Sequence, residues 1–290
     1  MQSDVVKRGR EELRQVRKRS RSLYWTVGLF SAFANLLMLT GPLYMLQVYD
    51  RVLGSGSQET LVALSLLVAF AYAVMGILDY TRGRIMARVG ARFQDDLDRR
   101  VFDAVVRKSA VAPDSKTNGN LADLEAVQRM ITSPVLMAAF DLPWTPIFFA
   151  GIFVFHAYLG YLALIGGAIL VVIAIANQYL SRGAQRRAAI AGQQATSMAD
   201  QIRTEAEMVQ AMGMRDAAFT RWQKARSQAL EGQVIAADVG GSFTSMTKTI
   251  RLFLQSAMLG LGAYLVLQNE LTPGAMIAGS ILLGRALAPV

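Results

Sequence analysis

Long runs of apolar residues, separated by stretches rich in Lys and Arg, dominate the pattern of this chain. The runs do not alternate between apolar and polar positions and are too long for core strands, so they predict helices. A bilayer core about 30 Å thick requires roughly 20 apolar residues per helix. We therefore predict an all-α membrane protein: a basic segment at 1–22, then a domain at 23–290 with six transmembrane helices. The predicted spans are about 23–48, 61–79, 134–156, 159–180, 247–267 and 271–290.

The distribution of charge predicts how these spans are oriented. The chain is 53% hydrophobic and yet carries a net charge of +9. Of its 30 Lys and Arg, 28 lie in residues 1–22, 81–132 and 181–251, which six spans place on one side. Only Arg51 lies in a loop on the opposite side. By the positive-inside rule, the N-terminus is cytoplasmic. A basic face for nucleic acid would not be divided between apolar runs, so we expect no nucleic-acid partner.

Few residues are available for catalysis or metal binding. The chain has no cysteine and one histidine, His156, which we interpret as an interfacial neighbour of Tyr158 and Tyr161. We predict no catalytic residue and no metal site. The first run is longer than the 7–15 apolar residues of a signal peptide, so we expect it to remain in the membrane.

The two long basic segments have the periodicity of helical hairpins. In the first, Ile85, Val89, Phe93 and Leu97 recur every four residues, which predicts one face of a helix that continues out of the membrane. The pattern breaks at 112–120 and resumes at Leu121. The second segment repeats the scheme, with its turn at 212–214. Both hairpin tips are expected to touch one cytoplasmic partner.

Four stretches make the chain similar to a known family. Gly41–Val52, Phe140–Phe148, Glu207–Met214 and Ser280–Pro289 resemble the corresponding parts of type I protein-secretion permeases, which are ABC exporters. The second of these reads Phe-Asp-Leu-Pro-Trp-Thr-Pro-Ile-Phe. The likeness implies the transmembrane domain of a type 1 ABC exporter, whose hairpin tips are coupling helices that seat in an ATPase domain.

The resemblance also implies a function and partners. The family exports unfolded polypeptides with C-terminal signals across the bacterial inner membrane, as a homodimer joined to a periplasmic adaptor and an outer-membrane channel. Two sets of residues are expected to couple the membrane domain to the ATPase. Coupling helix 1 comprises Ser115, Lys116, Thr117, Asn118, Gly119, Asn120, Leu121 and Asp123; coupling helix 2 comprises Met214, Arg215, Asp216, Phe219 and Arg221.

The phosphate-binding motif of such an ATPase is missing from residues 1–290. No Gly-x-x-x-x-Gly-Lys-Ser/Thr run occurs, and Gly54–Ser57 lies in an external loop without the lysine. We expect the chain to be the membrane portion of a longer ATP-hydrolysing translocase. ATP and Mg²⁺ would then bind the absent ATPase domain, and this chain would hold no cofactor.

Polar residues inside the apolar runs are candidates for the translocation path. A charge in mid-bilayer costs several kcal/mol, so Arg285 is expected to face the path or the dimer axis, with snorkelling to the surface as the alternative. Asp141 lies beside Pro143 and Pro146, where it either caps a helix start at a kink or contacts entering substrate. Gln255 is a further path candidate, although it could instead join Asn35 and Asn177 in hydrogen bonds between helices.

Two other functions share parts of this pattern. The same architecture serves exporters of lipids or drugs. A membrane anchor or sensor could also use long cytoplasmic arms without transporting anything. The distinctive motifs favour the protein exporter over both.

Overall fold

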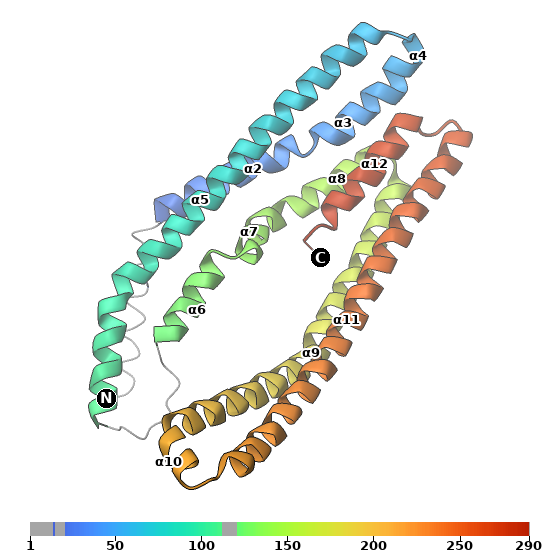
Figure 1. The fold of residues 1–290 in the computed structure, drawn as a ribbon. Coiled ribbons are helices and arrows are strands. Elements are labelled where there is room, and N and C mark those ends of the chain that lie inside the picture. The colour runs from blue at the N-terminus through green and yellow to red at the C-terminus, as the bar shows by residue number, and fades with distance from the viewer. Residues whose placement is uncertain (1–13, 15–20, 112–120, 290) are drawn as a thin grey trace. The chain divides into compact units, whose positions relative to one another are not determined.

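The computed structural model describes residues 14, 21–111 and 121–289, and within these ranges every regular element is helical (Figure 1). The all-α prediction is therefore confirmed. In chain order the elements are α2 (Arg21–Leu37), α3 (Thr40–Gln47), the π-helical turn η1 (Val48–Val52), α4 (Leu53–Ser55), α5 (Gln58–Val111), α6 (Leu121–Ile131), α7 (Pro134–Asp141), the 3-10 turn η2 (Leu142–Trp144), α8 (Thr145–Phe155), α9 (Ala157–Thr204), α10 (Ala206–Ala211), α11 (Arg215–Leu267) and α12 (Pro273–Ala286).

Five helical stretches in the described residues are long and apolar enough to cross a membrane. They are Arg21–Ser55, Gln58–Arg107, Pro134–Phe155, Ala157–Thr204 and Arg215–Leu267. Four of them contain one of the first five predicted spans, and the third ends one residue short of its predicted limit at 156. The sixth predicted span is helical at α12, but its 14 residues rise only about 21 Å, less than a bilayer core.

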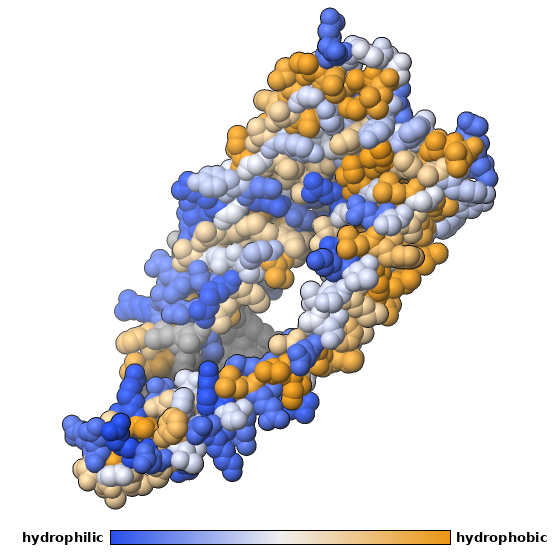
Figure 2. Space-filling model, turned by 45° about the vertical axis from the view of Figure 1, so that its right-hand side comes forward, coloured by the Kyte–Doolittle hydropathy of each residue, from blue (hydrophilic) through white to orange (hydrophobic). Residues whose placement is uncertain are grey.

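The apolar runs leave large side chains uncovered, as a lipid-facing surface does. On α5, Val62, Leu66, Phe70 and Ile77 are each more than half exposed. Figure 2 shows hydrophobic side chains gathered at the level of the first turns of α5, whereas the hairpin end at α10 is mainly hydrophilic. In water such a surface would favour aggregation, but in a bilayer it matches the solvent.

The first span differs from its predicted limits. Pro42 has no N–H to bond the Met38 carbonyl, and α2 accordingly ends at Leu37, with two residues between it and the start of α3 at Thr40. The helix then continues through η1 and α4 to Ser55. The predicted spans leave residues 49–60 as a loop, and this prediction is wrong for residues 49–55, which are helical. The chain reverses at Gly56, whose φ of +65° lies in the left-handed region that glycine adopts without strain.

The α-helix of the third span is interrupted where its two prolines lie. Pro143 lies in η2 and Pro146 in the first turn of α8, so two backbone N–H donors are missing within four residues. The α-helical ladder gives way to a 3-10 turn there, as expected where proline removes backbone donors.

Both predicted arms are continuous with their spans. Helix α5 runs unbroken from Gln58 to Val111, and α6 resumes at Leu121, as the four-residue spacing indicated. The first tip at 112–120 lies outside the described residues. The second arm descends on α9, turns through α10 and returns on α11, which confirms a turn at 212–214.

The chain divides into two compact units. The first comprises residues 1–160 and 259–289, and the second comprises residues 161–258. In the first unit, Val27, Met86, Val89 and Ile131 form a buried cluster that joins α2, α5 and α6. Residues Ile85 and Phe93 of the predicted stripe pack against this cluster. The four-residue period of α5 therefore predicted the face that packs.

Small residues let α9 and α11 approach closely in the second unit. A Cβ atom on Gly166 would lie 2.3 Å from both methyl carbons of Leu254, which is 5% exposed. Lower in the arm, a Cβ on Gly232 would lie 3.4 Å from the Ala188 Cα. Gly260, by contrast, faces open space. Gly166 therefore permits the close contact of α9 with α11.

We predict opposite outcomes for two glycine substitutions in apolar helices. Gly166→Ala should overpack the contact with Leu254 and lower the free energy of unfolding by about 1–3 kcal/mol. Gly260→Ala should be neutral or stabilising by up to about 1 kcal/mol, because alanine has the higher helix propensity. Thermal unfolding of both variants in detergent checks this, and an equal loss in both would contradict the packing of α9 on α11.

Candidate functional site

The tip of the second hairpin ends in a glycine-dependent cap. Helix α9 ends at Thr204, Glu205 departs from helical geometry, and α10 adds a turn and a half. The Met214 N–H then donates to the Val209 carbonyl at 2.9 Å and the Gly213 N–H to the Gln210 carbonyl at 3.1 Å. This pair of bonds is the Schellman motif, and it requires the positive φ of Gly213. The turn that exposes the tip is thus encoded locally.

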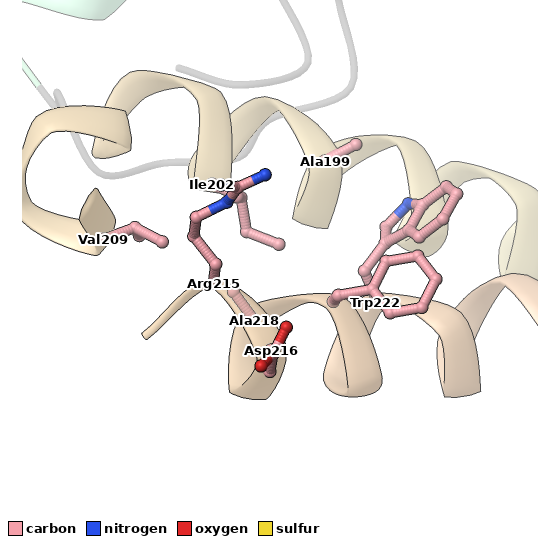
Figure 3. Close-up of a pocket in the computed structure, with 8 residues that line it drawn as sticks. Ala199, Ile202, Val209, Arg215, Asp216, Ala218 and Trp222 are labelled. Carbon is pink, nitrogen blue, oxygen red and sulfur yellow. The ribbon is translucent and has the colours of Figure 1, made fainter. Parts of the chain in front are cut away.

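A pocket of about 420 Å³ lies beside this turn (Figure 3). The rings of Phe219 and Trp222 form one wall, with centroids 6.0 Å apart at a tilted angle. Ile202 and Val209 face them from α9 and α10. The other lining residues are Ala199, Arg215, Asp216 and Ala218.

Exposed apolar side chains surround the pocket although the hairpin end is polar overall. Met208, Met212, Met214 and Phe219 are 46–62% exposed. We call these four residues the tip patch. Methionine adapts its shape to a partner, and an apolar patch with a polar surround is typical of a docking surface.

The residues expected to form coupling helix 2 lie at the start of α11. Met214 precedes the helix, and Arg215, Asp216, Phe219 and Arg221 occupy its first two turns, all of them exposed. The short separate helix of the tip is α10, which begins eight positions before Met214, the first residue of the predicted segment. Asp216 in the first turn is favourable for the helix dipole.

Most of expected coupling helix 1 lies outside the described residues. This applies to Ser115, Lys116, Thr117, Asn118, Gly119 and Asn120, while Leu121 begins α6. Asp123 is exposed in the first turn of α6, where a negative charge is stabilising.

A buried ion pair, not anticipated from the sequence, joins three helices of the first unit. Arg82 of α5 is 8% exposed and donates to both carboxylate oxygens of Asp141, at 2.9 and 3.3 Å. The same guanidinium donates to the Ser31 hydroxyl at 2.9 Å. Asn35 of α2 adds a 2.7 Å bond to Asp141 and one of 2.8 Å to the Ser31 carbonyl.

This network revises the interpretation of Asp141. Its side chain makes no capping hydrogen bond at η2, so the expected cap is wrong. Asp79 adds a second carboxylate, with Oδ1 3.1 Å from the Arg82 Nε at an angle outside hydrogen-bond geometry. Asn35 bonds between helices as predicted. The charge pattern groups Arg82 with the basic residues of 81–132, and nothing in the sequence near it identifies Asp141 as its partner.

Two polar contacts lie at the opposite end of the first unit. The Asp50 carboxylate in η1 accepts from the Thr272 hydroxyl at 2.6 Å and from the Gly274 N–H at 2.8 Å. His156 Nδ1 accepts from the Tyr158 N–H, and its Nε2 lies 3.3 Å from Glu270. The predicted neighbour relation of His156 and Tyr158 is confirmed, with ring centroids 5.3 Å apart.

The remaining path candidates are isolated from such networks. Arg285 is half-buried in the last turn of α12, and no described acidic residue forms an ion pair with it. Gln255 is exposed on α11 in the second unit. Asn177 accepts from Ser181 within its own helix at 2.7 Å. Across the described ranges, no cluster of three potential metal ligands occurs.

Comparison with known proteins gives a consistent result. Residues 24–288 match the family described as the ABC transporter transmembrane region. The chain is 36% identical over 272 residues to the type I secretion system ATP-binding protein PrsD of Rhizobium meliloti (strain 1021), covering 93% of this chain and 47% of that protein. It is 22% identical over 279 residues to the leukotoxin translocation ATP-binding protein LktB of Mannheimia haemolytica, covering 93% and 39%. The chain thus spans less than half the length of these relatives.

We predict that substituting Arg82 alone lowers the free energy of unfolding more than substituting both Arg82 and Asp141. Arg82→Leu alone should cost about 3–5 kcal/mol, because it leaves the Asp141 carboxylate buried without its cation. Asp141→Leu should cost less, because Asp79 still lies 3.1 Å from the Arg82 Nε. The double variant should recover much of the Arg82→Leu loss, since the one carboxylate that remains, Asp79, has a side chain that is 39% exposed to solvent. Thermal unfolding in detergent measures both.

The matched control for this cycle is the ion pair of Arg203 with Asp200. These side chains lie 3.6 Å apart and are 83% and 61% exposed. Arg203→Leu should therefore change stability by under about 1 kcal/mol. Equal effects at Arg82 and Arg203 would contradict the burial of the network.

Proposed function

The chain belongs to the ABC transporter transmembrane family, and from this premise we propose that it forms the translocation pathway of an ATP-driven type I protein exporter. In this proposal the cargo is an unfolded polypeptide with a C-terminal signal, moved from the cytoplasm to the outside. Membership of this family means that the chain is a multi-pass, all-helical membrane domain. The export of proteins is what we propose in addition.

The observation that carries the proposal is the exposed tip patch at the end of a long arm. An arm that only needed to stay in solution would have charged residues at its tip. This one instead presents Met208, Met212, Met214 and Phe219 beside an aromatic-lined pocket. The surface suits a rigid partner that presses on the tip, as an ATPase domain would. The printed names of the two relatives, an ATP-binding protein of type I secretion and one of leukotoxin translocation, support the same choice.

The orientation follows from the charges. We place the N-terminus and both hairpin tips in the cytoplasm, because 28 of the 30 basic residues lie on that side. A bacterial inner membrane is the proposed location. The short turns at His156 and Asn269 then face the periplasm.

The proposed assembly supplies what this chain lacks. An ATPase portion, with ATP and Mg²⁺, would dock on the coupling residues of both tips. A second copy of the chain would complete the pathway, and a periplasmic adaptor and an outer-membrane channel would continue it. Arg285 and Gln255 remain the proposed lining residues. Asp141 is a weaker candidate, because Arg82 and Asn35 already occupy its carboxylate.

The proposal is tested by deleting the gene and comparing secreted proteins. Loss of one or a few polypeptides from the culture medium, restored by the full-length protein, is the expected outcome. An unchanged medium together with altered lipid content of the membrane would favour the lipid exporter instead.

We predict that Phe219→Ala uncouples the tip from its partner. Phe219 is 56% exposed and packs on Trp222, so its loss removes an aromatic anchor of the tip patch. Aromatic anchors contribute about 2 kcal/mol or more, so secretion should fall about tenfold or more. Phe253→Ala is the matched control, because Phe253 is 71% exposed in an apolar span and should tolerate the change.

The absence of cysteine from this chain allows a direct readout of docking. A single Met214→Cys substitution provides one thiol at the tip for cross-linking to the ATPase portion. Cross-linking should weaken in the Phe219→Ala background and persist in the Phe253→Ala background. Normal secretion by Phe219→Ala would argue against docking at this tip.

A further inference from the structure

A second pocket, of about 350 Å³, lies between α9 and α11 in the second unit. Two cationic residues line it, Lys248 and Arg251, both from α11. Three further polar residues complete the rim, Asn177 from α9 and Thr244 and Thr247 from α11. Ala174 and Leu252 form its apolar part. No acidic side chain contributes to the lining.

The pocket lies at the edge of the apolar runs. Ile250 begins the fifth run, so Lys248 and Arg251 flank the boundary between polar arm and apolar span. On α9, Asn177 lies just before Tyr179 and Arg182, residue types that gather at the membrane surface. Exposed apolar residues continue from the pocket toward the span, namely Val172, Ile175 and Leu252.

The cations of this pocket have no acidic partner among the described residues. Residues 161–199 and 239–269 contain no Asp or Glu at all. Nearby cations on α9 are engaged: Arg182 lies over the Tyr179 ring at 5.5 Å, and the Arg187 Nε donates to the Gly183 carbonyl at 3.3 Å. The Arg251 Nε is buried and makes no hydrogen bond to any residue that the structure describes. A buried donor without an acceptor is costly, so this atom is suited to an anion from outside the chain.

A phosphate group satisfies these side chains best. Arginine donates in a fork that fits phosphate oxygens, and lysine adds a mobile point charge. The Thr247 hydroxyl and the Asn177 side-chain NH2 can donate to the glycerol oxygens of a headgroup. The Thr244 hydroxyl, which donates to the Gly240 carbonyl, can accept from a glycerol hydroxyl. The apolar surface at Leu252 and Ile175 then meets the start of an acyl chain. Free phosphate would use the cations but leave this apolar surface uncovered.

We propose that the pocket binds the headgroup of an anionic phospholipid, such as phosphatidylglycerol, from the leaflet that faces the basic side of the protein. That leaflet is cytoplasmic if the proposed orientation holds, and the binding of the lipid does not depend on the orientation. It goes beyond export, since the lipid is a bound component of the domain and not its cargo. Lipid binding in detergent does not depend on secretion, so either proposal can fail without the other.

The test is a lipid titration of the full-length protein in a non-ionic detergent, followed by native mass spectrometry. Dioleoyl phosphatidylglycerol and dioleoyl phosphatidylcholine are the two probes, and inorganic phosphate in excess is the competitor. The wild-type protein should retain phosphatidylglycerol in preference to phosphatidylcholine, and phosphate should not displace it. The variant K248Q/R251Q should weaken phosphatidylglycerol binding about tenfold or more, because each cation near the surface contributes to the attraction.

Two further variants separate the site from general charge and from misfolding. K224Q/R226Q removes the same charge from exposed positions on α11 and should bind phosphatidylglycerol normally. K248R/R251K keeps the charge in the pocket and should retain most of the binding. Unchanged affinity in K248Q/R251Q, an equal loss in K224Q/R226Q, or displacement by inorganic phosphate would each overturn the proposal.

Discussion

The backbone of a membrane span has no water to bond, and this constraint determines most of the structure. Each N–H and C=O in the hydrocarbon region must find its partner within the protein, which a helix provides for every residue. Helices α5, α9 and α11, of 48 to 54 residues, meet this requirement without interruption. Breaks in the ladder occur where proline removes a donor, at Pro42 and at Pro143. Apolar side chains can then remain exposed, because lipid replaces water around them.

The same constraint confines strong polar interactions to the ends of the spans. Arg82 and Asp141 lie where α5 leaves the apolar region and α7 approaches it, while Asp50 and Thr272 lie at the other end of the unit. Hydrogen bonds between spans are individually weak, about 0.6 kcal/mol on average, so packing must hold the middle of the bundle together. Residues such as Gly166, which admit no side chain, supply that close packing.

Periodicity and charge predicted the helices and the hairpins because both are local properties of the sequence. The four-residue stripe at Ile85, Val89 and Phe93 identified the packed face of α5 before its partner was known. The partner itself could not be predicted: Asp141 lies 59 positions from Arg82, and nothing near either residue specifies the other. The pocket at Lys248 and Arg251 was missed for the same reason, since Asn177 joins it only when α9 packs on α11. Sequence therefore located the turn of the second hairpin, and tertiary contact was needed to find the ion pair and the second pocket.

The tip and the membrane-edge pocket are connected by a single helix. From Arg215 to Lys248, α11 is unbroken, and at 1.5 Å per residue it spans about 50 Å. A straight helix of this length transmits displacement well, but Gly240 and Gly241 lie next to each other between the two sites, and a Cβ atom on either would meet nothing within 4 Å. Each glycine costs about 1 kcal/mol of helix propensity relative to alanine. The hydroxyls of Ser242 and Thr244 bond back to the Asp238 and Gly240 carbonyls, a pattern that favours bending. The stretch 238–244 thus combines low helix propensity with hydroxyl groups that favour bending, in the part of α11 that joins the tip to the pocket.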